Sequence, residues 1–156
     1  MTPLNLPPAQ LKLRRSDKGD IVVFDPLRKK NVILTPEEWV RQNFVSYMTN
    51  QLGYPQSLMA NEIAITLNNT RRRCDTVVYD LHAKPMVIVE YKAPEIDITQ
   101  EVFDQIVRYN MVLHARCLIV SNGLSHYCCI IDYNNSTYKF LKEVPTFAQL
   151  TADNTK

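Results

Sequence analysis

Residues 71–92 read RRRCDTVVYDLHAKPMVIVEYK and contain two segments that are typical of strands joined by a turn. Residues 74–79 are rich in β-branched and aromatic side chains. Residues 86–91 form an apolar run of the kind seen in strands buried on both faces. Residues 82–85 between them suit a turn. The sequence therefore predicts two neighbouring strands near the middle of the chain.

Helices are predicted on both sides of these strands. Thr35 is a good N-cap, Pro36 suits the first helical position, and apolar residues follow at helical spacing up to Gly53. This spacing predicts one helix over 36–52, and a similar pattern predicts another over 99–114. Further strands are predicted at 21–24, 31–34, 61–67, 116–121, 126–133 and 137–141. The order of helix, three strands, helix, strand and added hairpin favours a mixed sheet with helices packed against it.

Length and composition are those of one compact domain. The chain has 156 residues, of which 46% are hydrophobic and 22% are charged, so it can build a core of its own. We expect the domain to cover residues 19–150, with a polar, proline-containing arm at 1–18 and a flexible tail at 151–156. The net charge of +2 permits a nucleic-acid partner without requiring one.

Several classes of protein are disfavoured by what the sequence lacks. No apolar run approaches the roughly 20 residues that a membrane span needs. Residues 1–13 lack the apolar centre of an export signal, so we expect a cytoplasmic protein with no membrane partner. The three glycines, at 19, 53 and 123, cannot form a phosphate-binding loop. The sequence is therefore not an ATP-driven motor by itself.

Charged residues end the buried strand predicted at 86–91. Glu90 and Lys92 are two residues apart, so their side chains share one face of the strand. Asp75 begins the preceding strand, and antiparallel pairing would bring it beside them. Charges at the end of a buried strand are costly unless they are paired, solvated or metal-bound. The pattern predicts a pair of carboxylates with a lysine beside it.

Such a trio suits the hydrolysis of a phosphodiester. Two adjacent carboxylates repel each other, and a divalent cation relieves that repulsion. Mg²⁺ prefers one or two carboxylates, several waters and phosphate oxygens. The metal acidifies a water and stabilises charge on the scissile phosphate, while a lysine can orient that water. The competing explanation is a structural ion-pair cluster at a sheet edge, because perturbed charge clusters are often structural.

Several other stretches accompany this trio. They are 35–42 (TPEEWVRQ), 53–55 (GYP), 73–75 (RCD), 89–94 (VEYKAP) and the pair Gln105 and Tyr109. Together with the order of elements, they resemble the PD-(D/E)XK nuclease superfamily. More narrowly, they resemble the amino-terminal nuclease domain of type I restriction enzyme R subunits. The resemblance covers roughly residues 20–135.

The resemblance implies a fold and an activity. The fold is α/β (α+β), with a restriction-endonuclease-like αβββαβ core, a mixed central sheet and an added C-terminal β-hairpin. The activity is that of a metal-dependent DNA endonuclease. On this basis Asp75 and Glu90 would bind Mg²⁺, for which Mn²⁺ could substitute, and Lys92 would serve the attacking water.

The resemblance also implies residues around that core. An acid on the first helix often joins the site in this family, and Glu37 or Glu38 matches by position, although a capping box alone would explain Glu38. Glu62 is a further candidate, or else simply a solvent-facing strand residue. Gln105 and Tyr109 would border the site and contact the DNA backbone or the lysine. Their alternative is a packed tyrosine with a hydrogen-bonding glutamine on one helix face.

Three arginines stand just before Asp75. A run such as Arg71, Arg72 and Arg73 is usually a solvated turn. At this position it could instead hold phosphates on the approach to the site. We therefore treat the three arginines as candidate DNA-binding residues.

Two functions of different classes are consistent with these patterns. The first is a Mg²⁺-dependent DNA endonuclease. R subunits continue into an ATP-driven translocase that this sequence lacks, so a separate helicase/translocase or methyltransferase subunit would be a partner. The second is a catalytically silent module of the same fold that binds DNA or docks to such a partner. Many nucleases of this kind dimerise to cut both strands, so a homodimer is also considered, although no interface is visible in the sequence.

Overall fold

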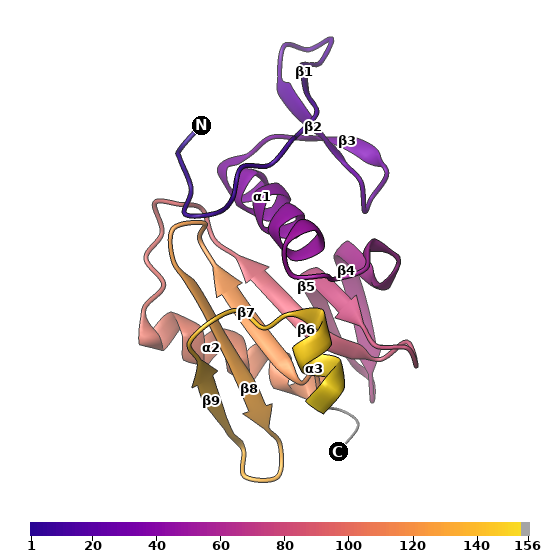
Figure 1. Cartoon of the computed structure of the whole chain (residues 1–156), viewed down its shortest axis with the longest axis vertical. Helices are drawn as coiled ribbons and strands as arrows, with labels where there is room; N and C mark the ends of the chain where they lie inside the picture. The colour runs from indigo at the N-terminus through magenta and orange to yellow at the C-terminus, as the bar shows by residue number, and fades with distance from the viewer. Residues whose placement is uncertain (154–156) are drawn as a thin grey trace.

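A six-stranded mixed sheet forms the centre of the computed structural model, which describes residues 1–153 (Figure 1). Its strands lie in the order β4, β5, β6, β7, β8 and β9. They span Met59–Leu67, Thr70–Tyr79, Pro85–Tyr91, Cys117–Ser121, His126–Asp132 and Thr137–Leu141. β6 and β7 are parallel, whereas all other neighbours in this sheet are antiparallel. A parallel pair needs a crossover connection, and the second helix provides it.

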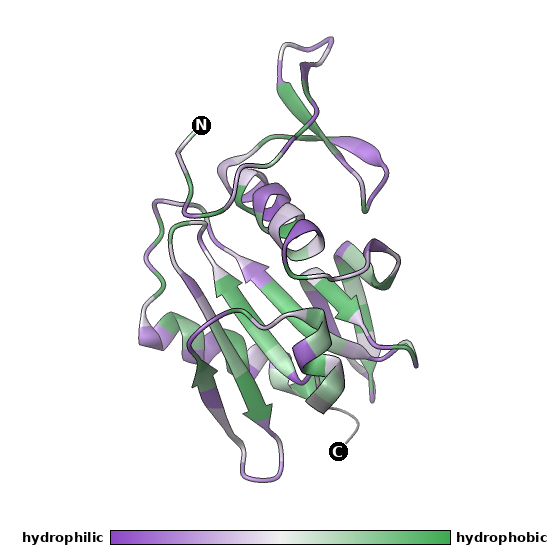
Figure 2. Cartoon of the chain, in the orientation of Figure 1, coloured by the Kyte–Doolittle hydropathy of each residue, from purple (hydrophilic) through white to green (hydrophobic). Residues whose placement is uncertain are grey.

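Helices cover both faces of this sheet. α1 (Pro36–Asn50) packs on the face that carries Val87 and Val89. α2 (Gln100–Asn110) packs on the opposite face, against Ile88. Because side chains alternate along a strand, β6 is buried on both sides, and Figure 2 shows it and its neighbours β7 and β8 as largely hydrophobic. In the described part of the chain, no helix has the length and apolar character that crossing a membrane requires.

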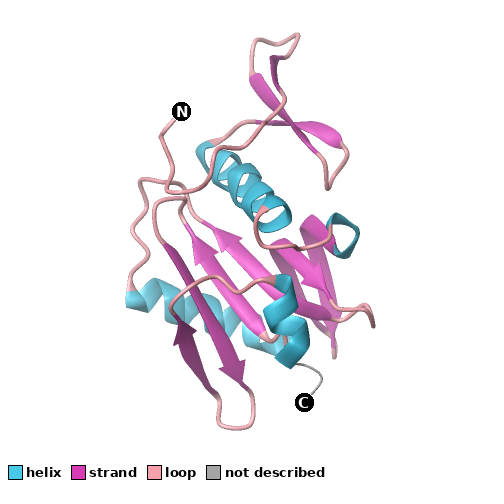
Figure 3. Cartoon of the chain, viewed as in Figure 1, coloured by secondary structure: helices cyan, strands magenta, loops and turns pink. Residues whose placement is uncertain are grey.

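A second sheet of three short antiparallel strands projects beyond α1, away from the large sheet (Figure 3). Its strands are β1 (Leu13–Arg15), β2 (Ile21–Asp25) and β3 (Lys30–Ile33). The central strand β2 buries Val22 and Val23, while most of the surrounding side chains are exposed. We call residues 12–33 the N-terminal ribbon.

The predicted order of elements and the mixed sheet are confirmed, but several boundaries differ. The first helix ends at residue 50 rather than 52, and the second gives way after residue 110 to the 3₁₀ turn Met111–Leu113. β5 begins at Thr70, so the three arginines lie in a strand and not in a turn. The reason is a tight hairpin at Asn68 and Asn69, both of which have positive φ and let β4 and β5 pair up to their ends.

Besides the 3₁₀ turn Gln56–Leu58, two elements of regular structure, β1 and α3, were not predicted. β1 lies within the arm expected at 1–18 and pairs with β2. α3 (Phe147–Asp153) takes up the first three residues of the tail expected at 151–156, while residues 154–156 lie outside the described residues. Both elements are short and lack a strong periodic pattern, so only their packing on the rest of the chain defines them. Leu150 of α3, for example, is 2% exposed.

Candidate functional site

β5 and β6 separate at the point where Asp75 and Glu90 lie. Their pairing extends to Thr76 opposite Val89. Beyond that pair, the Asp75 carboxylate accepts the Tyr91 N–H at 2.8 Å, where a strand ladder would use a main-chain carbonyl. β6 meanwhile continues beside β7. We call this point the β5–β6 fork, and Asp75 is held across it by its own carboxylate.

Glu90 lies beside Asp75 and is half-buried. Burial, the negative charge of Asp75 and a hydrogen bond to Asp75 raise the pKa of Glu90 to about 9. The charge of Lys92 and a hydrogen bond from Asn110 act in the opposite direction. Glu90 Oε1 is buried and has no hydrogen-bond partner. The structure thus brings Asp75, Glu90 and Lys92 together and adds Asn110 of α2, which sequence reasoning missed.

Of the two acids that begin α1, Glu37 is exposed and is near enough to the fork for the charge of Asp75 to act on it. The pKa of Glu37 is raised by partial desolvation and by the charge of Asp75, while Arg41 and Lys92 oppose that rise. Consecutive helix residues point about 100° apart around the axis, so Glu38 has different neighbours. The sequence left open whether Glu37 or Glu38 accompanies the trio. The charge of Asp75 acts on the carboxyl of Glu37, which favours Glu37 for that position.

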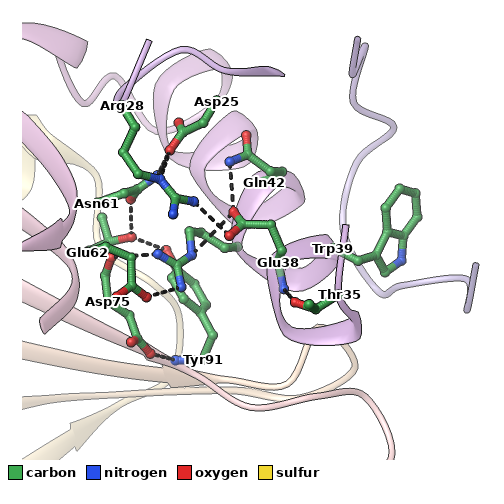
Figure 4. A network of polar contacts seen from close by, with 12 residues as sticks. Asp25, Arg28, Thr35, Glu38, Trp39, Gln42, Asn61, Glu62, Asp75 and Tyr91 are labelled. Carbon is green, nitrogen blue, oxygen red and sulfur yellow. Dashed lines mark hydrogen bonds and ion pairs between the residues drawn. The ribbon is translucent and has the colours of Figure 1, made fainter. Parts of the chain in front are cut away.

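Glu38 is held in a buried network of ion pairs (Figure 4). Its N–H donates to the capping Thr35 Oγ1 at 3.0 Å. Its carboxylate accepts from Arg28 Nη2 at 2.7 Å and from Gln42 Nε2 at 3.0 Å, and lies 3.5 Å from Arg41 Nε. These contacts occupy both carboxylate oxygens. Glu38 therefore joins α1 to the N-terminal ribbon.

Glu62 is likewise engaged by arginines. Its Oε1 accepts from Arg41 Nη2 at 2.6 Å and its Oε2 from Arg73 Nε at 3.0 Å. Burial raises the pKa of Glu62, but the hydrogen bonds and charges of the two arginines outweigh it, and the pKa is lowered overall. The Glu62 backbone also has a φ of +52° within β4, which is unusual for a residue with a side chain. Glu62 is thus an ionised member of the network beside the fork.

Arg41 is the central residue of this network and was not singled out from the sequence. Its side chain is 5% exposed and lies between Glu38 and Glu62. Its Nη1 also donates to the main-chain carbonyl of Asp75 at 3.3 Å, and its guanidinium lies 5.6 Å from the centre of the Tyr91 ring. Arg41 therefore contacts Asp75 and Tyr91, the two residues that are hydrogen-bonded across the fork. Its position three residues after Glu38, on the apolar side of the helix, was the available sequence signal.

The candidate DNA-binding residues come from two elements. Arg71, Arg72 and Arg73 lie on β5, and Gln105 and Tyr109 lie on α2. Arg72 Nε donates to the Tyr109 carbonyl at 2.9 Å, and its guanidinium lies 4.5 Å from the centre of the Tyr109 ring, so this pair joins β5 to α2. Arg71 and Gln105 are exposed, and Arg73 is exposed despite its ion pair. Among residues 1–153, no hydrogen bond or ion pair joins Gln105 to the carboxylates of the fork. Gln105 and Tyr109 lie on the outer surface of α2.

Asp75 and Glu90 are the residues of the fork whose chemistry would suit a divalent cation. In the described residues, no group of three or more His, Cys, Asp or Glu side chains could hold a metal ion. Asp75 and Glu90 nevertheless match the one or two carboxylates that Mg²⁺ takes alongside water and phosphate oxygens. Glu90 Oε1 is a buried acceptor without a partner, and such atoms commonly have a ligand or ion to satisfy them.

Comparison with known protein families shows which family this chain belongs to. The family described as Type I restriction enzyme R protein N terminus (HSDR_N) matches residues 36–145, which is more than half of the chain. The chain belongs to this family. The matched span of the R-protein N terminus includes α1, the fork and α2, and it begins after the N-terminal ribbon. The sequence resemblance to R subunits is therefore confirmed.

A solved structure supports the fold of this R-protein N terminus. It is a fragment assigned to an HsdR subunit of a type I restriction enzyme from Vibrio vulnificus YJ016, with a TM-score of 0.55 and 17% sequence identity. The match covers 76% of this chain and 25% of that one, so the chain spans about a quarter of that protein fragment. No curated protein sequence gives a significant match. At this identity the likeness concerns the fold, and it confirms the predicted mixed α/β architecture.

Proposed function

We propose that this R-protein N terminus is a Mg²⁺-dependent DNA endonuclease that hydrolyses phosphodiester bonds at the β5–β6 fork. The observation that carries the proposal is the convergence of Asp75 and Glu90, with a buried oxygen of Glu90 left without a partner. Burial, followed by the negative charge of Asp75, raises the pKa of Glu90, so that ionising both carboxylates together is costly. A divalent cation would offset that cost.

Asp75 and Glu90 would hold the metal, and Mn²⁺ could replace Mg²⁺ because both take oxygen ligands. When bound, the metal supplies an acidified water and stabilises the charge that develops on the scissile phosphate. Asp75 is ready for this role because the Tyr91 N–H holds one of its oxygens and Arg41 holds its main-chain carbonyl. Glu90 gives up its proton when it becomes a ligand.

Lys92 provides the positive charge of the site. Its charge acts on both Glu90 and Glu37 and lowers the pKa of each. Lys92 would orient the attacking water and stabilise the negative charge of the transition state. Glu37 would contribute a further acidic group from α1, as an acceptor for the proton of that water.

The DNA would be held by groups that surround the fork. Arg71 and Arg73 are exposed on β5, where guanidinium groups can bind phosphates. DNA is therefore the proposed partner. A helicase/translocase or methyltransferase subunit, in the setting of a restriction-modification complex, is proposed as the protein partner. A homodimer is proposed for cutting both strands.

A catalytically silent module is the second candidate function. It is favoured by one observation: the described residues contain no set of three acidic or other ligand side chains around a metal position. In that case the fork would be a structural charge cluster, and the chain would bind DNA or a partner subunit without cutting.

Nicking of supercoiled plasmid DNA tests the proposal. Wild-type protein is expected to nick the plasmid with Mg²⁺ or Mn²⁺ and not with EDTA. Lys92→Ala and Asp75→Asn should each lower the rate by about 10²-fold or more, because each removes a group that acts in the transition state. Lys84→Ala, which changes an exposed lysine in the turn before β6, is the matched control and should nick like wild type. Plasmid that stays intact with every metal, while DNA binding persists, would favour the silent module.

A further inference from the structure

The charge of this protein is unevenly distributed along the chain. Residues 12–33 contain seven basic and three acidic side chains, a net charge of +4. The rest of the chain contains eleven basic and thirteen acidic side chains, a net charge of −2. The small overall charge of +2 therefore hides a strongly basic segment. That segment is the N-terminal ribbon, which projects from the domain beyond α1 (Figures 1 and 2).

Most of the basic side chains of the ribbon are exposed and make no ion pair among the described residues. Six of them are exposed: Lys12, Arg14, Arg15, Lys18, Lys29 and Lys30. The ion pairs found within residues 1–153 include none of these six, whereas the seventh, Arg28, is paired with Asp25 and Glu38. Unpaired cations at this density repel one another, and an anionic partner relieves that repulsion.

The base of the ribbon is tied to the β5–β6 fork through buried polar contacts (Figure 4). Arg28 pairs with Asp25 of β2 and with Glu38 of α1, and Arg41 next to Glu38 contacts the Asp75 carbonyl. Separating buried, paired charges of this kind costs free energy, so these pairs fix the position of the ribbon relative to α1. The ribbon is therefore attached to the same helix that borders the fork.

A second route connects the ribbon to the fork. The carboxylate of Asp25, which is fully buried, also accepts from Asn61 Nδ2 at 3.1 Å. Asn61 Oδ1 accepts from Thr76 Oγ1 at 2.6 Å, and that hydroxyl accepts from the Tyr91 hydroxyl at 2.8 Å. Two chains of contacts that both include Asp25 thus link the basic ribbon to the fork.

We propose that the N-terminal ribbon is a second contact with double-stranded DNA, in which its exposed lysines and arginines bind backbone phosphates independently of sequence. This inference rests on the proposed function, because that function makes DNA the polyanion that reaches the neighbouring fork. The ribbon lies outside the span that matches the R-protein family. Lysine and arginine contacts to phosphate supply affinity and orientation without reading bases. The ribbon would therefore raise affinity for the duplex and leave sequence preference unchanged.

DNA binding by the full chain in EDTA tests this proposal separately from cleavage. The probe is a fluorescein-labelled 20-base-pair duplex, and its anisotropy is followed between 50 and 200 mM salt. The ribbon variant carries Lys18→Gln, Lys29→Gln and Lys30→Gln. The matched control carries Lys84→Gln, Lys139→Gln and Lys142→Gln, which are three exposed lysines elsewhere with the same change in net charge.

The ribbon variant is expected to bind at least about tenfold more weakly than wild type. Each lost phosphate contact should also lower the slope of log K against log salt by about 0.9. The control should stay within about twofold of wild type, and replacing the three ribbon lysines by arginine should preserve binding. Thermal unfolding of all variants checks that the ribbon variant remains folded.

Several results would overturn the inference. Equal losses in both triple variants would show that only net charge matters, and wild-type binding by the ribbon variant would show that the ribbon does not contact DNA. Loss of binding to phosphatidylserine vesicles with unchanged DNA affinity would assign the ribbon to a lipid surface instead. Ribbon-dependent binding without nicking by wild type would support the inference and refute the nuclease proposal. Nicking by wild type, with DNA binding that does not depend on the ribbon, would support the nuclease proposal and refute this inference.

Discussion

Two adjacent acids at the start of α1 have different surroundings. Partial desolvation and then the charge of Asp75 raise the pKa of Glu37, whereas both oxygens of Glu38 are occupied by Arg28, Gln42 and Arg41. In the sequence the two acids are adjacent and chemically alike. The difference arises because a helix turns about 100° per residue, so neighbours meet different surroundings. The contacts that each side chain makes therefore distinguish these two acids.

Arg41→Ala is expected to destabilise the protein by about 3 kcal/mol, because it leaves the buried carboxylates of Glu38 and Glu62 without their shared cation. Urea unfolding at pH 7 measures the free energy of unfolding. Arg108→Ala, at an exposed position on α2, is the control and should change stability by less than about 0.5 kcal/mol. An Arg41→Ala variant as stable as that control would mean that the network contributes little.

At the scale of elements, short segments depend on the surfaces that receive them. α3 has seven residues, fewer than an isolated helix needs to be stable in water. It is anchored because Leu150 is buried, the Phe147 ring lies 5.7 Å from that of Tyr54, and the Phe147 N–H donates to the Leu52 carbonyl at 3.0 Å. The Tyr54 hydroxyl also donates to the Pro145 carbonyl at 2.7 Å. α3 thus closes the core beneath the end of α1.

Leu150→Ala is expected to lower the free energy of unfolding by about 2–4 kcal/mol, because it leaves a cavity under α3. Chemical denaturation followed by circular dichroism gives the value. Leu81→Ala is a matched control, since Leu81 is 84% exposed and its loss should cost little. If both variants lost the same small amount of stability, α3 would not be part of the cooperative core.

At the scale of the whole molecule, the fork makes the free energy of unfolding depend on pH. Folding raises the pKa of Glu90 from a model-peptide value of 4.5 to about 9, mainly through burial and then through Asp75. Between these values the folded state keeps a proton that the unfolded state releases. This contribution to stability is full below pH 4.5 and is lost as the pH rises toward 9. A bound divalent cation would replace that proton, so metal binding and pH are linked.

Glu90→Gln is therefore expected to flatten the pH dependence of stability in EDTA. Wild-type protein should lose stability between pH 5 and 9 with a slope of at most about 1.4 kcal/mol per pH unit, which corresponds to one proton. The free energy of unfolding of both proteins is measured at intervals across this range. Glu143→Gln, at an exposed position, should follow the wild-type curve. Parallel curves for Glu90→Gln and wild type would mean that Glu90 is not protonated in the fold.

Local patterns were sufficient to predict most elements and the central trio. Thr35 does cap α1, with its hydroxyl accepting the Glu38 N–H, and the apolar run before Glu90 is a strand buried on both faces. The two-residue spacing of Glu90 and Lys92 and the antiparallel neighbour carrying Asp75 were visible because strand geometry is regular. These are features in which each residue is determined by close neighbours in the chain.

The sequence by itself determined the order of elements, the mixed sheet and the approach of Asp75 to Glu90, since periodicity, caps and turns act over a few residues. Only the tertiary structure decided that Arg41 supports the fork, that Glu37 rather than Glu38 senses it, and that a basic ribbon is attached to the same network. Those outcomes depend on contacts such as Arg41 with the Asp75 carbonyl, which join residues 34 positions apart. No local pattern specifies such a contact, because it exists only once the helix has packed on the sheet.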